Sequence, residues 1–257
     1  MEVSLKGHTA LITGGSRGIG QAMAERFAAA GARVGIIARR PDILEEALKS
    51  VSRPATDKVA AFSHDLSTTA ACRSAFEDVV GALGPVDILV NNVGGQRAMP
   101  FLKAADEDFE ADLNIKLFPA IRLSRLALPY MREQKWGRIL NTLATVARHP
   151  AAGSLPTSAT RAAGLAFTKA LASEFGPDGV QVNALLVGLI ESEQIQNMIS
   201  KAADPEQLRV DLTQKIPLGR LGRPEEFANL ACLLASDHGS YINGCAINVD
   251  GGMSPVP

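Results

Sequence analysis

The sequence predicts an α/β fold of the doubly wound class, with a seven-stranded, mostly parallel sheet flanked by helices on both faces. Short apolar runs alternate with helical patterns along the whole chain, which is typical of that class. Several runs, such as Ile88–Asn91, are apolar throughout, as strands covered on both faces are. No repeat, low-complexity tract or long linker interrupts the alternation, so residues 1–257 are interpreted as one domain.

The short apolar runs give the expected strands, and right-handed crossovers between them place helices on both faces of the sheet. Strands are expected at Thr9–Thr13, Arg33–Ala38, Lys58–Ser63, Ile88–Asn91, Gly137–Thr142, Val180–Leu186 and Ala246–Val249. Apolar residues three and four apart predict the helices between them. Helices are expected at Gly20–Ala30, Leu66–Leu83, Glu107–Gln134, Ser158–Phe175 and Pro224–Ala235.

One stretch, at about residues 188–217, fits neither pattern. It is polar and mixed, and it is too long to be a plain connection. Because long ordered loops are often active-site lids, we expect this stretch to cover a substrate.

Charge and composition exclude several classes of function. Lys and Arg number 26 against 27 Asp and Glu, which removes the electrostatic basis for binding nucleic acid or a membrane surface. The three cysteines are widely spaced and form no Cys-x-x-Cys pair, so neither a disulfide framework nor a metal site is expected. No apolar run approaches the ~18 residues that span a membrane, and no signal peptide is evident. We therefore expect a cytoplasmic protein that acts on a small molecule.

A glycine-rich turn lies directly between the first strand and the first helix, with the sequence Thr13-Gly14-Gly15-Ser16-Arg17-Gly18-Ile19-Gly20. Glycines let the backbone approach a pyrophosphate, and the N-terminus of the helix supplies N–H donors and partial positive charge. The turn therefore predicts a Rossmann-type dinucleotide site. Its expected contacts are Gly14, Ser16, Arg17, Gly18, Ile19 and Gly20.

The chain resembles the short-chain dehydrogenase/reductase family, in its compact branch of about 250 residues. The glycine turn matches that family's Thr-Gly-x-x-x-Gly-x-Gly, and Asn91-Asn92-Val93-Gly94 is similar to its Asn-Asn-Ala-Gly. Residues 220–226 and 248–252 match its C-terminal pattern. The resemblance implies a nicotinamide dinucleotide and adds the expected contacts Asp65, Leu66, Asn91, Gly94, Arg161, Gly188, Ile190 and Ser192.

The end of the second strand bears on the choice between the two nicotinamide cofactors. An acidic residue there would accept hydrogen bonds from the adenosine ribose and repel a 2′-phosphate. Here the strand ends in Arg39 and Arg40, with no acid before Asp42, and Arg17 lies in the glycine turn. Guanidinium groups suit phosphate binding, so the pattern favours NADP(H) over NAD(H).

The catalytic positions depart from the family pattern. The resemblance implies a Ser, a Tyr and a Lys, with an Asn behind them that Asn114 matches. Counting from Gly137-Arg138-Ile139, the other three positions hold Ala144, Thr157 and Arg161. A threonine hydroxyl has too high a pKa for acid–base work near neutral pH, and arginine does not release a proton. His149 is the titratable candidate in the loop after Ala144.

Two hypotheses stay open, and with them the question of whether the protein is an enzyme. The first is an NADP-dependent oxidoreductase with an atypical proton relay. The second is a non-redox NADP(H)-binding protein on the same fold, such as a pseudoenzyme, a sensor, a lyase or an isomerase. The resemblance also implies a homotetramer, and the small apolar residues of Ala159–Ala172 suit close packing between subunits.

Overall fold

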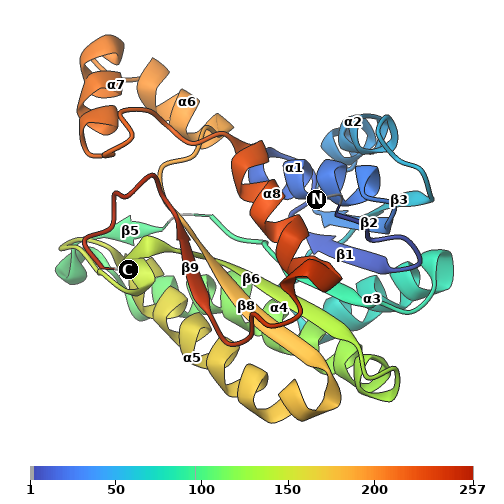
Figure 1. Cartoon of the computed structure of the whole chain (residues 1–257). Coiled ribbons are helices and arrows are strands. Elements are labelled where there is room, and N and C mark those ends of the chain that lie inside the picture. The colour runs from blue at the N-terminus through green and yellow to red at the C-terminus, as the bar shows by residue number, and fades with distance from the viewer. Residues whose placement is uncertain (1–2, 96, 257) are drawn as a thin grey trace.

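The structure, a computed structural model, describes residues 3–95 and 97–256. Its centre is a seven-stranded sheet with the strand order β3-β2-β1-β4-β6-β8-β9, and every pairing in that sheet is parallel (Figure 1). The strands are β1 (Thr9–Thr13), β2 (Arg33–Ala38), β3 (Val59–Ser63), β4 (Ile88–Asn91), β6 (Gly137–Ala144), β8 (Val180–Val187) and β9 (Ala246–Val249). The predicted doubly wound fold is confirmed.

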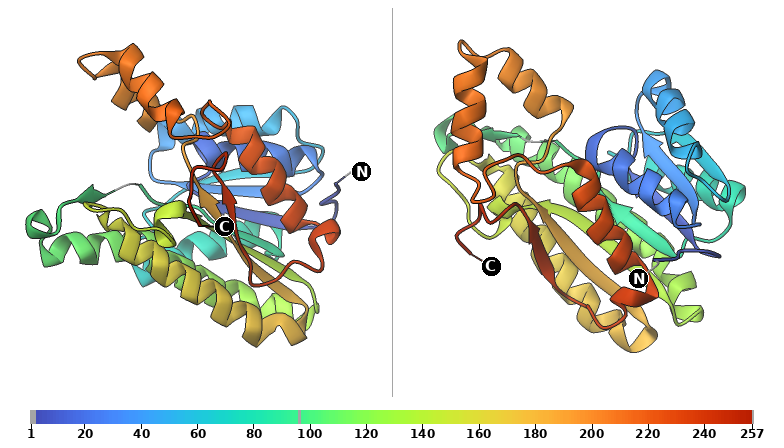
Figure 2. Two further views of the ribbon diagram at one scale, coloured as in Figure 1. Left: turned by 60° about the vertical axis from the view of Figure 1, so that its left-hand side comes forward. Right: turned by 45° about the horizontal axis from the view of Figure 1, so that its top comes forward.

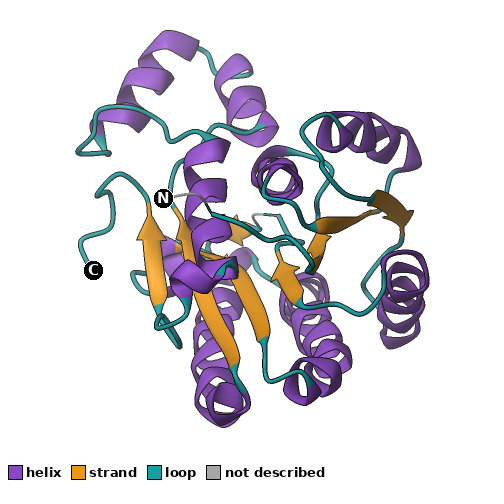
Figure 3. Ribbon diagram, turned by 45° about the vertical axis from the view of Figure 1, so that its right-hand side comes forward, coloured by secondary structure: helices purple, strands orange, loops and turns teal. Residues whose placement is uncertain are grey.

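Helices cover both faces of the sheet, as Figure 3 shows. One face packs against α1 (Gly18–Ala29), α2 (Pro41–Ser52) and α8 (Pro224–Ala235), with Phe27 and Phe227 fully buried between them. The other face packs against α3 (Thr69–Leu83), α4 (Asp106–Glu133) and α5 (Thr157–Phe175). Two apolar cores therefore hold the sheet in place and fix the edge at which its strands end.

Several elements differ from the sequence expectations, and two of the differences have a clear local cause. The helix α2 was not expected, because its Glu and Lys residues mask an apolar stripe that includes Ile43, Leu44 and Val51. The expected start of the third helix at Leu66 was wrong. The Thr68 side chain accepts a hydrogen bond from the Ala71 N–H at 3.2 Å, so α3 begins at Thr69.

The stretch at 188–217 is not a plain loop. It carries α6 (Glu193–Ser200) and α7 (Pro205–Gln214), whose N-caps are the side chains of Ser192 and Asp204. Figure 2 shows both helices standing away from the sheet. Within the described parts of the chain, we find no helix with the length and apolar character needed to span a membrane.

A second, two-stranded sheet lies beside the strand edge. Its strands β5 (Ala98–Met99) and β7 (Leu155–Pro156) pair antiparallel. The pairing brings the segment that follows β4 against the first turn of α5. Short 3-10 turns at Phe101–Lys103, Thr145–Ala147, Gly176–Asp178 and Asp237–Gly239 complete the described elements.

Candidate cofactor site and active site

The glycine turn and the Asn91–Gly94 segment follow the neighbouring strands β1 and β4, which run in parallel. Side-chain hydrogen bonds join the two segments. Thr13 Oγ1 accepts from the Asn92 N–H at 2.9 Å and from the Val93 N–H at 3.0 Å, and it donates to the Val90 carbonyl at 3.2 Å. Asn92 Nδ2 donates to the Gly14 carbonyl at 3.2 Å. Two motifs almost 80 positions apart are thereby held as one unit.

Gly20 is required by the close approach of the backbone in this turn. A Cβ at Gly20 would lie 2.1 Å from the Gly14 carbonyl oxygen and 2.5 Å from Asn92 Nδ2. Behind the turn, α1 begins without a side-chain cap, and its first turn holds no acidic residue. Its leading N–H groups and the positive end of its dipole are therefore available to an anion.

Three arginines lie near this turn. Arg39 and Arg40 follow β2 and are exposed. Arg17 is the N-cap residue of α1, and its guanidinium pairs with Glu193 at the start of α6. This ion pair links the glycine turn to α6 across 176 positions of the chain.

The remaining expected cofactor residues end up at the same strand edge. Asp65 is exposed and Leu66 is buried, just after β3. Gly188 packs so tightly that a Cβ would lie 2.4 Å from the Asp250 Cβ. Ile190 is buried, and Ser192 accepts a capping bond from the Ile195 N–H at 3.2 Å.

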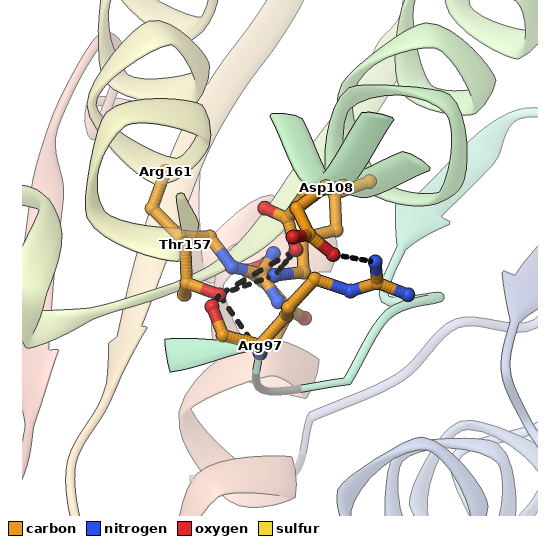
Figure 4. Close-up of polar contacts among 7 residues, drawn as sticks. Arg97, Asp108, Thr157 and Arg161 are labelled. Atoms are coloured by element: carbon orange, nitrogen blue, oxygen red, sulfur yellow. Dashed lines mark hydrogen bonds and ion pairs between the residues drawn. The ribbon is translucent and has the colours of Figure 1, made fainter. Parts of the chain in front are cut away.

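Thr157, the first residue of α5, has its hydroxyl fully engaged within the chain (Figure 4). Thr157 Oγ1 donates to the Arg97 carbonyl at 2.7 Å and accepts from the Arg97 N–H at 3.0 Å. It also accepts from Lys116 Nζ at 2.7 Å. The Arg97 side chain pairs with Asp108 at 2.8 Å, which holds this segment in place.

Lys116 and Asp112 form the central ion pair of the site, and the sequence analysis missed both. They lie one turn apart on α4 with side chains only 2% and 1% exposed, and Lys116 Nζ donates to Asp112 Oδ1. Burial lowers the pKa of the Lys116 ammonium to about 8, the Arg161 and Arg97 charges act in the same direction, and Asp112 opposes them. An amine with that pKa gains and loses protons near neutral pH.

Arg161 lies one turn beyond Thr157 on α5. Its Nη1 donates to the Thr142 carbonyl at 2.7 Å, and burial lowers the pKa of its guanidinium to about 10, so it stays charged at neutral pH. A cavity of about 10 Å³ beside it is lined by Lys116, Asn91 and Thr142. Three atoms of these side chains, Arg161 Nε, Asn91 Oδ1 and Thr142 Oγ1, are buried without a hydrogen-bond partner among the described residues. The volume is that of roughly one water molecule.

The other expected catalytic residues lie around this cluster. Ala144 ends β6, and the neighbouring Thr145 is buried. His149 is exposed in the loop beyond them. Asn114 is half-buried and lies roughly 200° around the α4 axis from Asp112, so it does not share the face that meets Thr157.

A sequence signal for the Lys116–Asp112 pair did exist. The residues stand four apart, and the face they share continues into Pro119, Ala120 and Leu123, all of which are buried. Charged residues at helical spacing usually lie on a solvent-exposed face. Here the apolar residues that continue the same stripe are the signal that Asp112 and Lys116 are buried.

Comparisons with known proteins find similarity along nearly the whole chain. The family model described as enoyl-(acyl carrier protein) reductase matches residues 14–254. The 3-oxoacyl-(acyl-carrier-protein) reductase of Aquifex aeolicus is 35% identical over 253 residues, which cover 98% of this chain and 100% of that protein. The 3alpha-hydroxysteroid dehydrogenase of Mediterraneibacter gnavus is 35% identical over 254 residues, 98% of each chain.

Among solved structures, the L-sorbose reductase of Gluconobacter frateurii complexed with NADPH and L-sorbose is similar over 100% of both chains. The TM-score is 0.95 and the sequence identity is 32%. Fold, glycine turn and similarity over nearly the full length agree, and the chain therefore belongs to the short-chain dehydrogenase/reductase family.

Proposed function

We propose that the protein is an NADP(H)-dependent oxidoreductase that interconverts a small carbonyl compound and its alcohol. The observation that carries the proposal is the uncapped N-terminus of α1 behind the glycine turn, with cations at Arg17, Arg39 and Arg40. Such a helix end binds a pyrophosphate, and arginines at the end of β2 suit a 2′-phosphate. The similar sorbose reductase was solved with NADPH.

The residues at the strand edge fit this cofactor. There is no space for a Cβ at Gly20, because the backbone of the glycine turn packs closely there. This close packing lets a pyrophosphate approach the N-terminus of α1. When bound, NADP(H) supplies or accepts the hydride. We assign the 2′-phosphate to Arg17, Arg39 and Arg40, the adenine to Asp65 and Leu66, and the nicotinamide half to Asn91, Gly94, Arg161, Gly188, Ile190 and Ser192.

Calorimetric titration tests the cofactor assignment. We expect micromolar NADPH binding and at least about tenfold weaker NADH binding, because a charge-assisted phosphate contact contributes about 1.5–3 kcal/mol. Arg39→Ala should weaken NADPH binding about tenfold and leave NADH binding unchanged. Arg53→Ala, an exposed arginine after α2, is the matched control. Equal affinity for both cofactors would contradict the preference for NADP(H).

Turnover is the second test of the proposal. A panel of ketones, aldehydes and keto acids is incubated with NADPH, and the loss of NADPH absorbance is followed against a control without protein. At least one substrate should give turnover. Tight NADPH binding with no turnover across the panel would contradict the oxidoreductase assignment.

A second candidate function is a non-redox NADP(H)-binding protein: a pseudoenzyme, a sensor, or a lyase or isomerase. It is favoured by the residues Ala144, Thr157 and Arg161 at the positions where the family resemblance implies Ser, Tyr and Lys. The triple variant Ala144→Ser, Thr157→Tyr, Arg161→Lys separates the two candidates. Reductase activity that appears in this variant and is lacking in the parent protein would support the non-redox function.

We also propose that the protein is a homotetramer. The outward face of α5 presents Ala159, Ala162 and Ala166, and Phe118 on the neighbouring α4 is 39% exposed. Small side chains beside an exposed aromatic ring suit close helix packing between subunits. Light scattering should give four times the chain mass of 27.1 kDa, and a monomeric mass would contradict the proposal.

A further inference from the structure

Lys116 occupies the neighbourhood in which the oxidoreductase function needs a proton donor. Its amine reaches from α4 to α5, where Nζ lies 2.7 Å from Thr157 Oγ1. Position 157 is where the family resemblance implies a tyrosine. A lysine from a different helix thus brings a titratable group to the side chain of this position.

We infer that Lys116 is the catalytic acid–base residue: its ammonium protonates the substrate oxygen in reduction, and its free amine accepts that proton in oxidation. The inference rests on the proposed oxidoreductase function. In reduction, bound NADPH would supply the hydride that forms the new C–H bond at the carbonyl carbon. The Nζ–H bond of Lys116 breaks as one intervening water takes that proton and gives another to the product oxygen, and the amine then regains its proton from solvent.

The neighbouring groups are poor proton donors. The Thr157 hydroxyl proton is committed to the Arg97 carbonyl at 2.7 Å, and a threonine hydroxyl has a very high pKa. Arg161 stays charged at neutral pH. His149 is exposed on the loop beyond Ala144. Lys116 is thus the group in the buried cluster whose proton affinity suits exchange near neutral pH.

The charges that face the Lys116 amine come from three elements. Asp112 on α4 accepts one of its protons, Arg161 projects from α5, and Arg97 lies in the segment before β5. The two arginines and burial favour the neutral amine, and Asp112 favours the ammonium. Their balance holds the pKa of Lys116 near 8, where either form is accessible to catalysis.

The stem of the Lys116 side chain also lies next to the expected cofactor contact Gly94. A Cβ on Gly94 would lie 3.0 Å from Lys116 Cγ and 3.1 Å from Arg161 Nη2. Gly94 follows Asn92 and Val93, whose N–H groups are bonded to the glycine turn. An ammonium has three N–H donors, and Asp112 and Thr157 take two of them. The third donor is assigned to the substrate oxygen through one water in the adjoining cavity of about 10 Å³.

The principal test is the pH profile of Lys116→Arg, which keeps the charge but does not release a proton. In the wild-type protein, kcat/KM for reduction should be level below pH 8 and fall above it, and kcat/KM for oxidation should rise through the same pH. In the variant, kcat should fall about 10²- to 10⁴-fold, and the change of kcat/KM near pH 8 should disappear. The NADPH affinity should stay within threefold of the wild-type value. Lys169→Arg, an exposed lysine on α5, is the matched control.

A measurement on the wild-type protein needs neither turnover nor a stable variant. NMR of isotope-labelled lysines should show one lysine with a titration midpoint near 8, and its signal should be missing from the Lys116→Arg spectrum. A midpoint at the ordinary lysine value, or a variant with unchanged rate and pH profile, would overturn the inference alone. Absence of turnover by the wild-type protein would overturn the proposed function and the inference together.

Discussion

The proposed cofactor region and the proposed catalytic region lie at one edge of the sheet, yet they are built differently. The cofactor region depends mainly on backbone: the glycine turn, the uncapped start of α1 and the N–H groups that Thr13 holds. The catalytic region depends on side chains from α4, α5 and the segment before β5, centred on Lys116 and Thr157. Backbone geometry leaves a local sequence pattern, whereas a site assembled from side chains can be rebuilt with residues from another helix.

The largest expected effect in the cofactor region comes from Gly20→Ala. Its Cβ would collide with the Gly14 carbonyl oxygen at 2.1 Å, so the turn must shift and α1 must move with it. NADPH affinity should fall by at least about a hundredfold, and overpacking of this kind costs about 1–3 kcal/mol of stability.

Calorimetry and thermal unfolding check the Gly20→Ala prediction. Gly81→Ala on α3 is the control, because no atom lies within 4 Å of a Cβ at that position. Unchanged NADPH affinity in Gly20→Ala would show that the turn does not hold the cofactor.

In contrast to Gly20→Ala, Asp112→Asn should retain NADPH binding and change the pH profile of the reaction. Removal of this carboxylate takes away the charge that raises the pKa of Lys116, so that pKa should fall below about 8. The decline of reduction with rising pH then begins at lower pH, and the rate at neutral pH drops. Loss of one partner of a buried ion pair also costs about 3–5 kcal/mol of unfolding free energy.

Kinetics across pH and chemical denaturation check the Asp112→Asn prediction. Asp108→Asn is the control, because Asp108 pairs with Arg97 at the more exposed margin of the same site. If kcat/KM for reduction still begins to fall at pH 8, or at a higher pH, Asp112 is not the group that raises the pKa of Lys116.

The smallest expected effect is that of Glu193→Gln, which removes the ion pair between the glycine turn and α6. Glu193 pairs with Arg17, and both side chains are substantially exposed, so the pair contributes about 0–1 kcal/mol. Release of Arg17 for the 2′-phosphate should tighten NADPH binding by up to about fivefold and leave NADH binding unchanged. Glu206→Gln, an exposed acid on α7, is the control, and weaker NADPH binding in Glu193→Gln would contradict the prediction.

Most of the fold was predictable because the strands are buried on both faces and read as apolar runs. The predicted strand β6 is extended by Leu143 and Ala144, and β8 is extended by Val187. The helix α2 escaped notice because it holds as many charged residues as apolar residues that reach the core. Local patterns therefore indicated the sheet better than they indicated the helices that cover it.

The catalytic cluster was less predictable, because its contacts join distant parts of the chain. Thr157 meets the Arg97 backbone 60 positions away and Lys116 41 positions away. No local pattern encodes such meetings, which depend on the pairing of β5 with β7 and on the packing of α4 against α5. The family resemblance pointed to positions 144, 157 and 161, but it did not indicate the lysine that reaches position 157.

The hydrogen bonds of Thr13 have a consequence for the thermodynamics of binding. Its hydroxyl already ties the glycine turn to Asn92 and Val93 within the chain. A dinucleotide that binds across these two segments therefore does not have to order them, and little conformational entropy is lost on the protein side. Thr13→Val should keep the strand but loosen this edge, so that cofactor binding acquires an entropic cost that Thr13→Ser avoids.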